Sequence, residues 1–232
     1  ELTTLKQALT TEKNRKLRRL RELYPEINIK LIAKKDFMKL LAKYSYGPSG
    51  QAKVKGVSQI LYSHTQLQRR IRALARRISH DYAGEQLVLA GVLKGVVCFM
   101  ADLMQHISLP VTLDFMAVSD YSSDSQVVKI TQDLDSSIKG KHVLMVEDIV
   151  DTGMTLNYIL SHLSTHKPAS LRVCTLLDKR ARRLIDVPLD YVGFEIPDLF
   201  VVGYGLDYKG EYRNLPFIGV LYPEFTKGNK NQ

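Results

Sequence analysis

The chain has 232 residues, 45% of them hydrophobic, and a formal net charge of +9. This length and apolar fraction suffice for a domain with its own core and exclude a chain that is disordered throughout. No apolar stretch is long enough to span a membrane, so we expect no membrane partner. The two cysteines, Cys98 and Cys174, lie in apolar segments without metal-ligand spacing. They predict buried reduced thiols and a cytoplasmic location.

The positive charge is concentrated at the beginning of the chain. Residues 1–56 hold 14 Lys and Arg against 5 Asp and Glu, whereas residues 57–232 hold 19 of each class. A strongly basic segment can bind nucleic acid. No recognisable binding motif accompanies the charge, so a solvated basic face is the favoured interpretation and we do not expect nucleic acid as a partner.

The basic segment predicts secondary structure of its own. Leucines at roughly helical spacing predict a helix within residues 3–24, "INIKLIA" alternates as a strand would, and "DFMKLLAKY" predicts a second helix. Residues 47–56, "GPSGQAKVKG", have the composition of a linker. Because one strand between two helices cannot bury itself, residues 1–46 are predicted to complete an upstream fused domain or to pack on a neighbour. An initial Glu1 in place of Met also suggests processing or a fragment.

From residue 57 onward, strands alternate with helices. Helices are predicted at 64–82, 95–107 and 155–166, and strands at 86–93, 110–118, 127–134, 143–146 and 171–177. This order predicts an α/β fold with a mostly parallel twisted sheet flanked by helices. Residues 190–221 are strand-like and rich in turns, and we expect them to form a small C-terminal hood lobe. Residues 57–232 are therefore predicted to be one domain.

The stretch "HVLMVEDIVDTGMTL" carries the clearest chemical signal. Asp151–Thr155 lies between a predicted strand and a predicted helix, where backbone N–H groups favour a phosphate. Thr152 and Thr155 add hydroxyl donors, and Gly153 permits a close approach. The preceding carboxylates, Glu147 and Asp148, suit ribose hydroxyls or a hard cation such as Mg²⁺. An ordinary turn would explain Asp-Thr-Gly alone, but the thirteen-residue pattern is far more specific.

"VLMVEDIVDTGMT" resembles the phosphoribosyl pyrophosphate (PRPP) motif of type I phosphoribosyltransferases, and its Glu-Asp form resembles the hypoxanthine-guanine branch. The resemblance extends over about residues 57–225. "GVLKGVVCFMADL" looks like the first active-site loop of this family, in which a cis peptide bond would precede Lys94. The resemblance implies that PRPP and its phosphates are bound by Glu147, Asp148, Asp151, Thr152, Gly153, Met154, Thr155, Lys94 and Gly95.

The resemblance also implies a purine site. Lys179 in "LLDKR" would meet the exocyclic oxygen of the purine. Asp151 would accept a proton at purine N7, and Arg213 would neutralise pyrophosphate, which makes Asp151, Lys179 and Arg213 the predicted catalytic residues. The remaining assignments are Tyr191 to stack on the base, Val192 to read its edge, and Asp198 to bind the metal beside Glu147 and Asp148. Alone, each residue could be structural, but their joint occurrence in family order favours the functional interpretation.

The predicted lid departs from the family pattern. Between Met116 and Ile130 the relatives carry a loop with a Ser-Tyr pair, whereas this chain has "AVSDYSSDSQVVKI". Tyr121 matches the pair, Asp120 stands where serine is usual, and the loop is a few residues shorter. Because an acid is unfavourable near pyrophosphate, the efficiency of closure is an open question for this chain.

Taken together, the resemblance implies a purine salvage transferase. It would transfer 5-phosphoribosyl from PRPP to hypoxanthine or guanine with Mg²⁺, forming IMP or GMP and pyrophosphate. The family resemblance also suggests a homodimer or homotetramer. The alternative is a regulatory protein that binds PRPP with the same fold and little or no catalysis.

Overall fold

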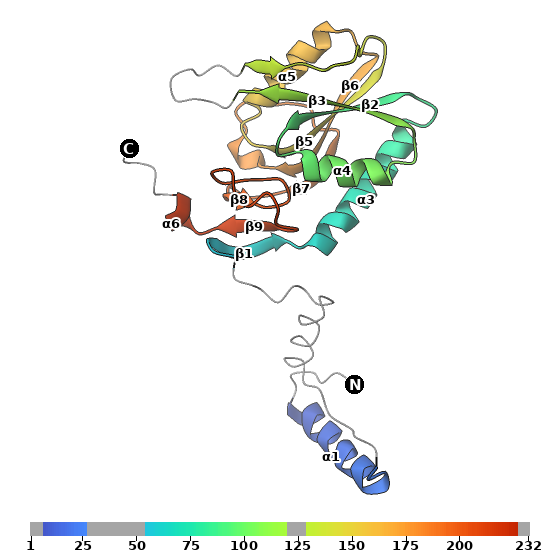
Figure 1. The fold of residues 1–232 in the computed structure, drawn as a ribbon, viewed down its shortest axis with the longest axis vertical. Coiled ribbons are helices and arrows are strands. Elements are labelled where there is room, and N and C mark those ends of the chain that lie inside the picture. Colours follow the sequence, from blue (N-terminus) through green and yellow to red (C-terminus); the bar gives the residue numbers. More distant parts are fainter. Residues whose placement is uncertain (1–6, 27–53, 120–128, 227–232) are drawn as a thin grey trace. The chain divides into compact units, whose positions relative to one another are not determined.

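The computed structural model describes residues 7–26, 54–119 and 129–226 (Figure 1). The chain divides into two compact units, Glu1–Lys55 and Gly56–Gln232, so the boundary falls at the end of the predicted linker. In the first unit, helix α1 (Gln7–Leu23) lies within the predicted helical segment. The strand and second helix predicted between residues 27 and 46 lie outside the described residues.

The larger unit is built on a six-stranded sheet. Its strands follow the order β4-β3-β2-β5-β6-β7, and all neighbours are parallel except β4, which is antiparallel to β3. The strands are β2 (Leu87–Leu93), β3 (Val111–Val118), β4 (Ile130–Gln132), β5 (His142–Val150), β6 (Ser170–Asp178) and β7 (Tyr191–Glu195). This confirms the predicted fold class.

Helices cover both faces of this sheet (Figure 1). Helices α3 (His64–Asp81) and α4 (Val97–His106) lie on one face, and α5 (Met154–Thr165) lies on the other. Successive side chains of a strand point to opposite faces, so β2 serves both cores. Leu89 packs with α3 and α4, whereas Val88 packs with α5, and both are at most 2% exposed. Burial on both faces explains why the sequences of the central strands are continuous runs of apolar residues.

A small antiparallel sheet forms the hood. Its order is β1-β9-β8, with β1 (Val57–Tyr62), β9 (Ile218–Leu221) and β8 (Val201–Val202). The short elements η1 (Arg180–Arg182) and α6 (Pro223–Thr226) complete the fold. The predicted lobe was wholly C-terminal, whereas the structure recruits β1 from the beginning of the unit. None of the helices in the described ranges could cross a membrane.

The order of the strands creates a crevice. The chain passes from β2 outward to β3, then returns to β5 on the other side of β2 and continues to β6 and β7. At such a switch point the connections leave in opposite directions, which opens a ligand site at the carboxyl ends of the two strands. Lys94 follows β2 and Asp151 follows β5. The fold therefore brings the two predicted loops together.

The strand that carries the acidic pair is longer than predicted. We expected the strand to end at Val146, but β5 continues to Val150 because β6 pairs with it as far as Val150↔Asp178. Pairing with β2 ends at Gly91↔Val146. Glu147 and Asp148 are therefore residues of strand β5 and not of a loop. Beyond Val146, β5 pairs with β6 but no longer with β2.

Candidate active site

The phosphate loop connects β5 to α5. Gly153 has φ +83°, and a Cβ there would lie 2.5 Å from the carbonyl oxygen of Ile185. The loop is held by the segment behind it, because Thr152 O accepts from the N–H groups of Leu184 at 2.9 Å and Ile185 at 3.1 Å. At the start of α5, Thr152 Oγ1 makes only a long 3.4 Å contact with Met154 N–H. The first turn of α5 therefore presents N–H groups suited to an anion.

The carboxylate pair is crowded and desolvated. Glu147 is 9% exposed, and burial together with the charge of Asp148 holds its pKa well above the ordinary value. Burial raises the pKa of Asp148 to about 6, although a hydrogen bond from Ile149 N–H and the charge of Arg213 oppose the shift. A Cβ on Gly95 would lie 1.7 Å from Asp148 Oδ2, so Gly95 packs directly on this carboxylate. A bound cation or hydroxyl donor would offset the cost of burying these two carboxylates.

We expect Asp148→Asn to stabilise the protein at neutral pH. Ionised Asp148 is disfavoured by burial, so its contribution to stability falls as the pH rises from its ordinary pKa of 3.8 to about 6. The asparagine removes this penalty and can still accept from Ile149 N–H. The free energy of unfolding should rise by about 1–2 kcal/mol at pH 7.5, or roughly 4 °C in Tm.

Thermal unfolding monitored by circular dichroism without ligands would measure this effect at pH 4 and pH 7.5. The difference from wild type should shrink toward zero at pH 4, where the native carboxyl is protonated and its burial carries little penalty. An equal or lower Tm for the variant at pH 7.5 would contradict the prediction.

The hood meets the first active-site loop at Gly205. The bond between Leu93 and Lys94 is cis, as the family resemblance implied. Gly205 has φ +98°, and a Cβ on it would lie 2.0 Å from the carbonyl oxygen of Gly95. Arg213 Nη1 donates to Gly205 O at 2.7 Å, and its Nη2 lies 2.7 Å from Asp207 Oδ1. The hood thus places a cation and a carboxylate beside the Lys94 loop.

A second charged cluster lies where β6 ends. Lys179 follows β6 with its side chain 8% exposed, and its Nζ lies 4.0 Å from Asp151 Oδ2. Arg182 Nε lies 3.2 Å from Asp151 Oδ1. This Oδ1 atom is buried and accepts no hydrogen bond from the described residues. The carboxylate is held by ion pairs with two cations, and its Oδ1 can still accept a proton or hydrogen bond from a ligand.

The structure does not bring Tyr191 to the crevice. Tyr191 is 0% exposed at the beginning of β7, its hydroxyl donates to Asp81 Oδ2 at 2.9 Å, and Arg77 lies 4.9 Å from its ring centre. No face of the ring is left for a base, so the predicted stacking role is wrong. The carbonyl oxygen of neighbouring Val192 accepts from Arg70 at 2.8 Å, and the role of Val192 in reading the base edge stays a prediction.

Sequence reasoning missed two residues of the hood lobe. Phe200 is 42% exposed, and its ring centre lies 5.4 Å from that of Tyr208. Asp207 pairs with Arg213 and raises the pKa of Asp148, which follows from like-charge proximity. The signal for Phe200 was its repetition of the aromatic-valine pattern of Tyr191 within the same stretch. Asp207 was recognisable as the acid that closes the "GYGLD" turn before Arg213.

Of the other predicted residues, Asp198 and Thr155 are described by the structure, and the lid residues are not. Asp198 lies 4.0 Å from Lys179 Nζ and 3.6 Å from Arg182 Nη1, between cations. Thr155 lies exposed in the first turn of α5. The lid residues Asp120 and Tyr121 lie outside the described residues, so their role stays a prediction.

Comparison with known proteins agrees with this site. The family model of the phosphoribosyl transferase domain matches residues 57–209. The hypoxanthine-guanine phosphoribosyltransferase of Streptococcus pneumoniae is 46% identical over 171 residues, which cover 72% of this chain and 95% of that protein. A crystal structure of a hypoxanthine phosphoribosyltransferase from Staphylococcus aureus has a TM-score of 0.71 at 45% identity, covering 73% of this chain and 94% of that one.

A further relative has a different organisation. The bifunctional protein TilS/HprT of Listeria monocytogenes is 45% identical over 171 residues, which cover 72% of this chain but 26% of that protein. Residues 1–56 lie outside the matched family model. The family model, the 46% identity over 95% of the Streptococcus pneumoniae protein and the shared fold show that the chain belongs to the hypoxanthine-guanine phosphoribosyltransferase family.

Proposed function

We propose that the protein is a purine salvage enzyme that transfers 5-phosphoribosyl from PRPP to hypoxanthine or guanine, forming IMP or GMP and pyrophosphate. The observation that carries this proposal is the joint placement of the Asp151–Thr155 loop, the Glu147–Asp148 pair and Lys94 at one switch point. The relatives named as hypoxanthine-guanine phosphoribosyltransferases support the enzyme over the regulatory alternative.

The arrangement suits a reaction that separates charge. The transition state carries positive charge on the ribose and negative charge on the leaving pyrophosphate. Lys94 and Arg213 are placed to neutralise pyrophosphate, while the N–H groups at the start of α5 hold the 5′-phosphate. Glu147 and Asp148 hold the ribose hydroxyls. Each group acts from a fixed position, so little reorganisation accompanies the reaction.

The residues present fit a Mg²⁺ ion. Glu147 and Asp148 offer oxygen ligands whose pKa values are raised mainly by burial, and the charge of Asp207 contributes to the shift of Asp148. When bound, the ion supplies positive charge to pyrophosphate. We propose Asp207 in place of Asp198 as the metal carboxylate of the hood, because the charge of Asp207 acts on Asp148, whereas Asp198 lies beside Lys179 and Arg182.

The effect of each acid on Mg²⁺ dependence would test this assignment. Asp207→Asn is expected to raise the KM for Mg²⁺-PRPP at least about tenfold, since a charged ligand is lost at the ion. Asp198→Asn provides the matched control in the same lobe and should change it less than about threefold. Initial rates at varied Mg²⁺ and fixed PRPP would measure both values. A larger effect of Asp198→Asn would restore the original assignment.

The purine would lie between the two charged clusters. In this proposal Lys179 donates a hydrogen bond to the 6-oxo group of hypoxanthine or guanine. Adenine is disfavoured because its 6-amino group is itself a donor and would face the donor of Lys179. The exposed ring of Phe200 replaces Tyr191 as our candidate for stacking on the base. Asp151 is the acceptor for the proton at N7, since its Oδ1 accepts no hydrogen bond from the described residues.

A spectrophotometric assay tests the function directly. The full chain would be supplied with PRPP and Mg²⁺ against hypoxanthine, guanine, xanthine and adenine. We expect nucleotide from hypoxanthine or guanine and none from adenine. PRPP binding by calorimetry without turnover on any base would overturn the enzyme and favour the regulatory alternative.

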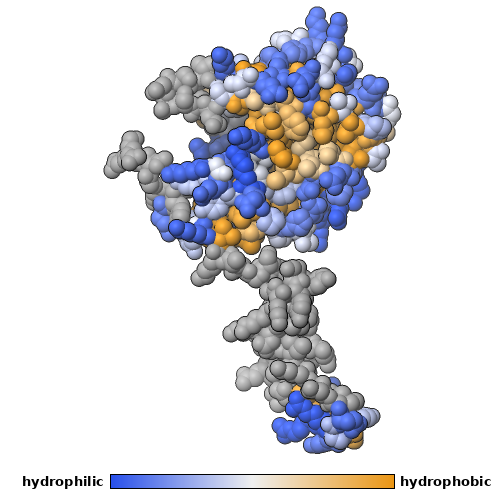
Figure 2. Space-filling view, viewed as in Figure 1, coloured by the Kyte–Doolittle hydropathy of each residue, from blue (hydrophilic) through white to orange (hydrophobic). Residues whose placement is uncertain are grey.

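We further propose a cytoplasmic homo-oligomer. Figure 2 shows apolar side chains gathered over α4 and the neighbouring strands. The exposed apolar residues of α4 and β3 are Val97, 47% exposed, and Leu113, 37% exposed. Such a patch suits a second copy of the chain. Both Cys98 and Cys174 are free thiols, consistent with a reducing compartment. Sedimentation equilibrium would test the assembly, and a monomer at micromolar concentration would refute it.

We also propose that residues 1–46 belong to an upstream fused domain. Their separation from the catalytic unit and the bifunctional Listeria relative support this arrangement. In α1, Leu20 and Leu23 remain 42% and 62% exposed, so the helix presents leucines that another surface can cover. Mass spectrometry of the protein isolated from its native cells would test the proposal. A native chain that begins with Met immediately before Glu1 would refute it.

A further inference from the structure

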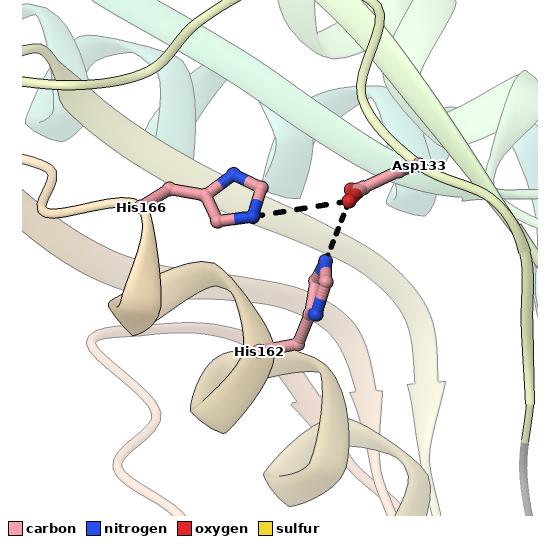
Figure 3. A group of neighbouring side chains, drawn as sticks. All are labelled: Asp133, His162 and His166. Carbon is pink, nitrogen blue, oxygen red and sulfur yellow. Dashed lines mark hydrogen bonds and ion pairs between the residues drawn. The ribbon is translucent and has the colours of Figure 1, made fainter.

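Two histidines and an aspartate converge away from the active-site crevice (Figure 3). His162 lies in the last turn of α5, His166 caps that helix, and Asp133 directly follows β4. His162 Nε2 lies 2.6 Å from Asp133 Oδ2, and His166 Nε2 lies 3.8 Å from the same oxygen. One ligand atom from each of the three residues lies within 4.8 Å of the others. No other such group occurs in the ranges that the structure describes.

The cluster is partly buried and oriented. The exposed fractions of the His162, His166 and Asp133 side chains are 30%, 36% and 38%. Asp133 Oδ1 accepts from Leu134 N–H at 2.8 Å, which fixes the carboxylate and leaves Oδ2 for both imidazoles. The three ligand atoms are therefore partly shielded from solvent and directed toward one another.

The spacing fits a tetrahedral ion. Histidines four residues apart lie on one face of a helix and are a common pair of zinc ligands. With Zn–N and Zn–O bonds of about 2.0–2.2 Å, two ligand atoms at a tetrahedral centre lie about 3.3–3.5 Å apart. The two observed distances to Asp133 Oδ2, 2.6 Å and 3.8 Å, bracket this value. Small rotations of these partly exposed side chains would therefore admit an ion between the three atoms.

The cluster is separate from the Mg²⁺ chemistry of the crevice. His162 is eight positions after Met154, the first residue of α5, which corresponds to about 12 Å along the helix. The ligand types also differ, since imidazole nitrogens favour Zn²⁺ and related transition metals whereas the crevice offers carboxylate oxygens. Occupancy of one site by its preferred ion therefore does not require the other site.

We propose that Asp133, His162 and His166 form a second metal site that binds one divalent transition ion of the Zn²⁺ class per chain. Three protein ligands leave the fourth position to water. The ion would join the segment after β4 to the end of α5. Because it binds the folded arrangement, it would stabilise the native state without entering the transfer reaction.

Equilibrium dialysis of the full chain against Zn²⁺, with Mg²⁺ in excess, would test the site. We expect one Zn²⁺ per chain for wild type. His162→Ala and His166→Ala should each weaken binding at least about tenfold, and Asp133→Asn should weaken it as well. His80→Ala is the matched control, because His80 also lies in the last turn of a helix and contacts Asp81, but belongs to no such three-residue group. It should bind Zn²⁺ as wild type does.

Two further readouts separate coordination from folding. Co²⁺ bound to wild type should give the intense visible bands of a tetrahedral site, and these should disappear in His166→Ala. Zn²⁺ should raise the Tm of wild type and of His80→Ala but not that of the cluster variants. The proposal is overturned if folded cluster variants, judged by their circular dichroism, bind Zn²⁺ as tightly as wild type. It is also overturned if wild type binds no Zn²⁺.

Discussion

Asp151→Asn is expected to lower kcat with hypoxanthine by about 10²- to 10³-fold, the usual contribution of a positioned proton acceptor. The asparagine matches the carboxylate in shape but cannot take the proton from N7. The neighbouring cations, Lys179 and Arg182, would also lose one of their two shared counter-ions. Initial rates at saturating PRPP would give kcat, and thermal unfolding would show that the fold is retained.

The control for this prediction is Asp198→Asn. Asp198 pairs with the same two cations, Lys179 and Arg182, but is 57% exposed in its side chain. If Asp151 acts as a proton acceptor and not only as a counter-ion, Asp198→Asn should leave kcat within about threefold of wild type. Equal losses in the two variants would show that charge balance around Lys179 explains the effect.

Gly153→Ala is expected to abolish measurable PRPP binding and to destabilise the protein by about 2–4 kcal/mol. The alanine would adopt φ +83° at a cost of about 1–2 kcal/mol. Its Cβ would also lie 2.5 Å from Ile185 O, a backbone atom that cannot rotate away. Relief of this contact must displace the segment that holds Thr152, and with it the phosphate loop. Calorimetric titration with Mg²⁺-PRPP and chemical unfolding would measure the two losses.

Gly140→Ala separates backbone strain from the clash. Gly140 has φ +71°, but a Cβ added there would meet no atom within 4 Å, so only the cost of the left-handed backbone applies. We expect a loss of about 1–2 kcal/mol and unchanged PRPP binding. If both variants lose the same stability and both bind PRPP, the contact between Gly153 and Ile185 does not position the loop.

The phosphate loop was predictable because its chemistry is local. Asp151 to Thr155 are consecutive, and their place between a strand and a helix follows from the apolar pattern on either side. The parallel sheet was predictable for a similar reason, since alternation of strands and helices leaves few topologies. The end of β5 was misplaced because Glu147 and Asp148 interrupt the apolar pattern while β6 continues to pair.

The purine site was harder to predict because it depends on tertiary contacts. Tyr191 and Phe200 are both aromatic residues followed by valine, nine positions apart. Only the packing of β7 against α3, where Tyr191 meets Asp81 and Arg77, shows which ring is buried. The Asp133, His162 and His166 cluster escaped prediction because its acid lies 29 positions before the first histidine. A contact between residues so far apart in the chain leaves no local pattern in the sequence.

The pairing of β1 with β9 has a consequence for biosynthesis. Val57 pairs with Leu221. During synthesis, the first strand of the catalytic unit therefore cannot pair until the last strand has been made. The six-stranded sheet and its phosphate loop can form earlier, since β2 to β7 are all made before β9. A nascent chain arrested before Ile218 would thus hold a formed phosphate loop under an incomplete hood. Acquisition of the complete substrate site is therefore one of the last events in making this protein.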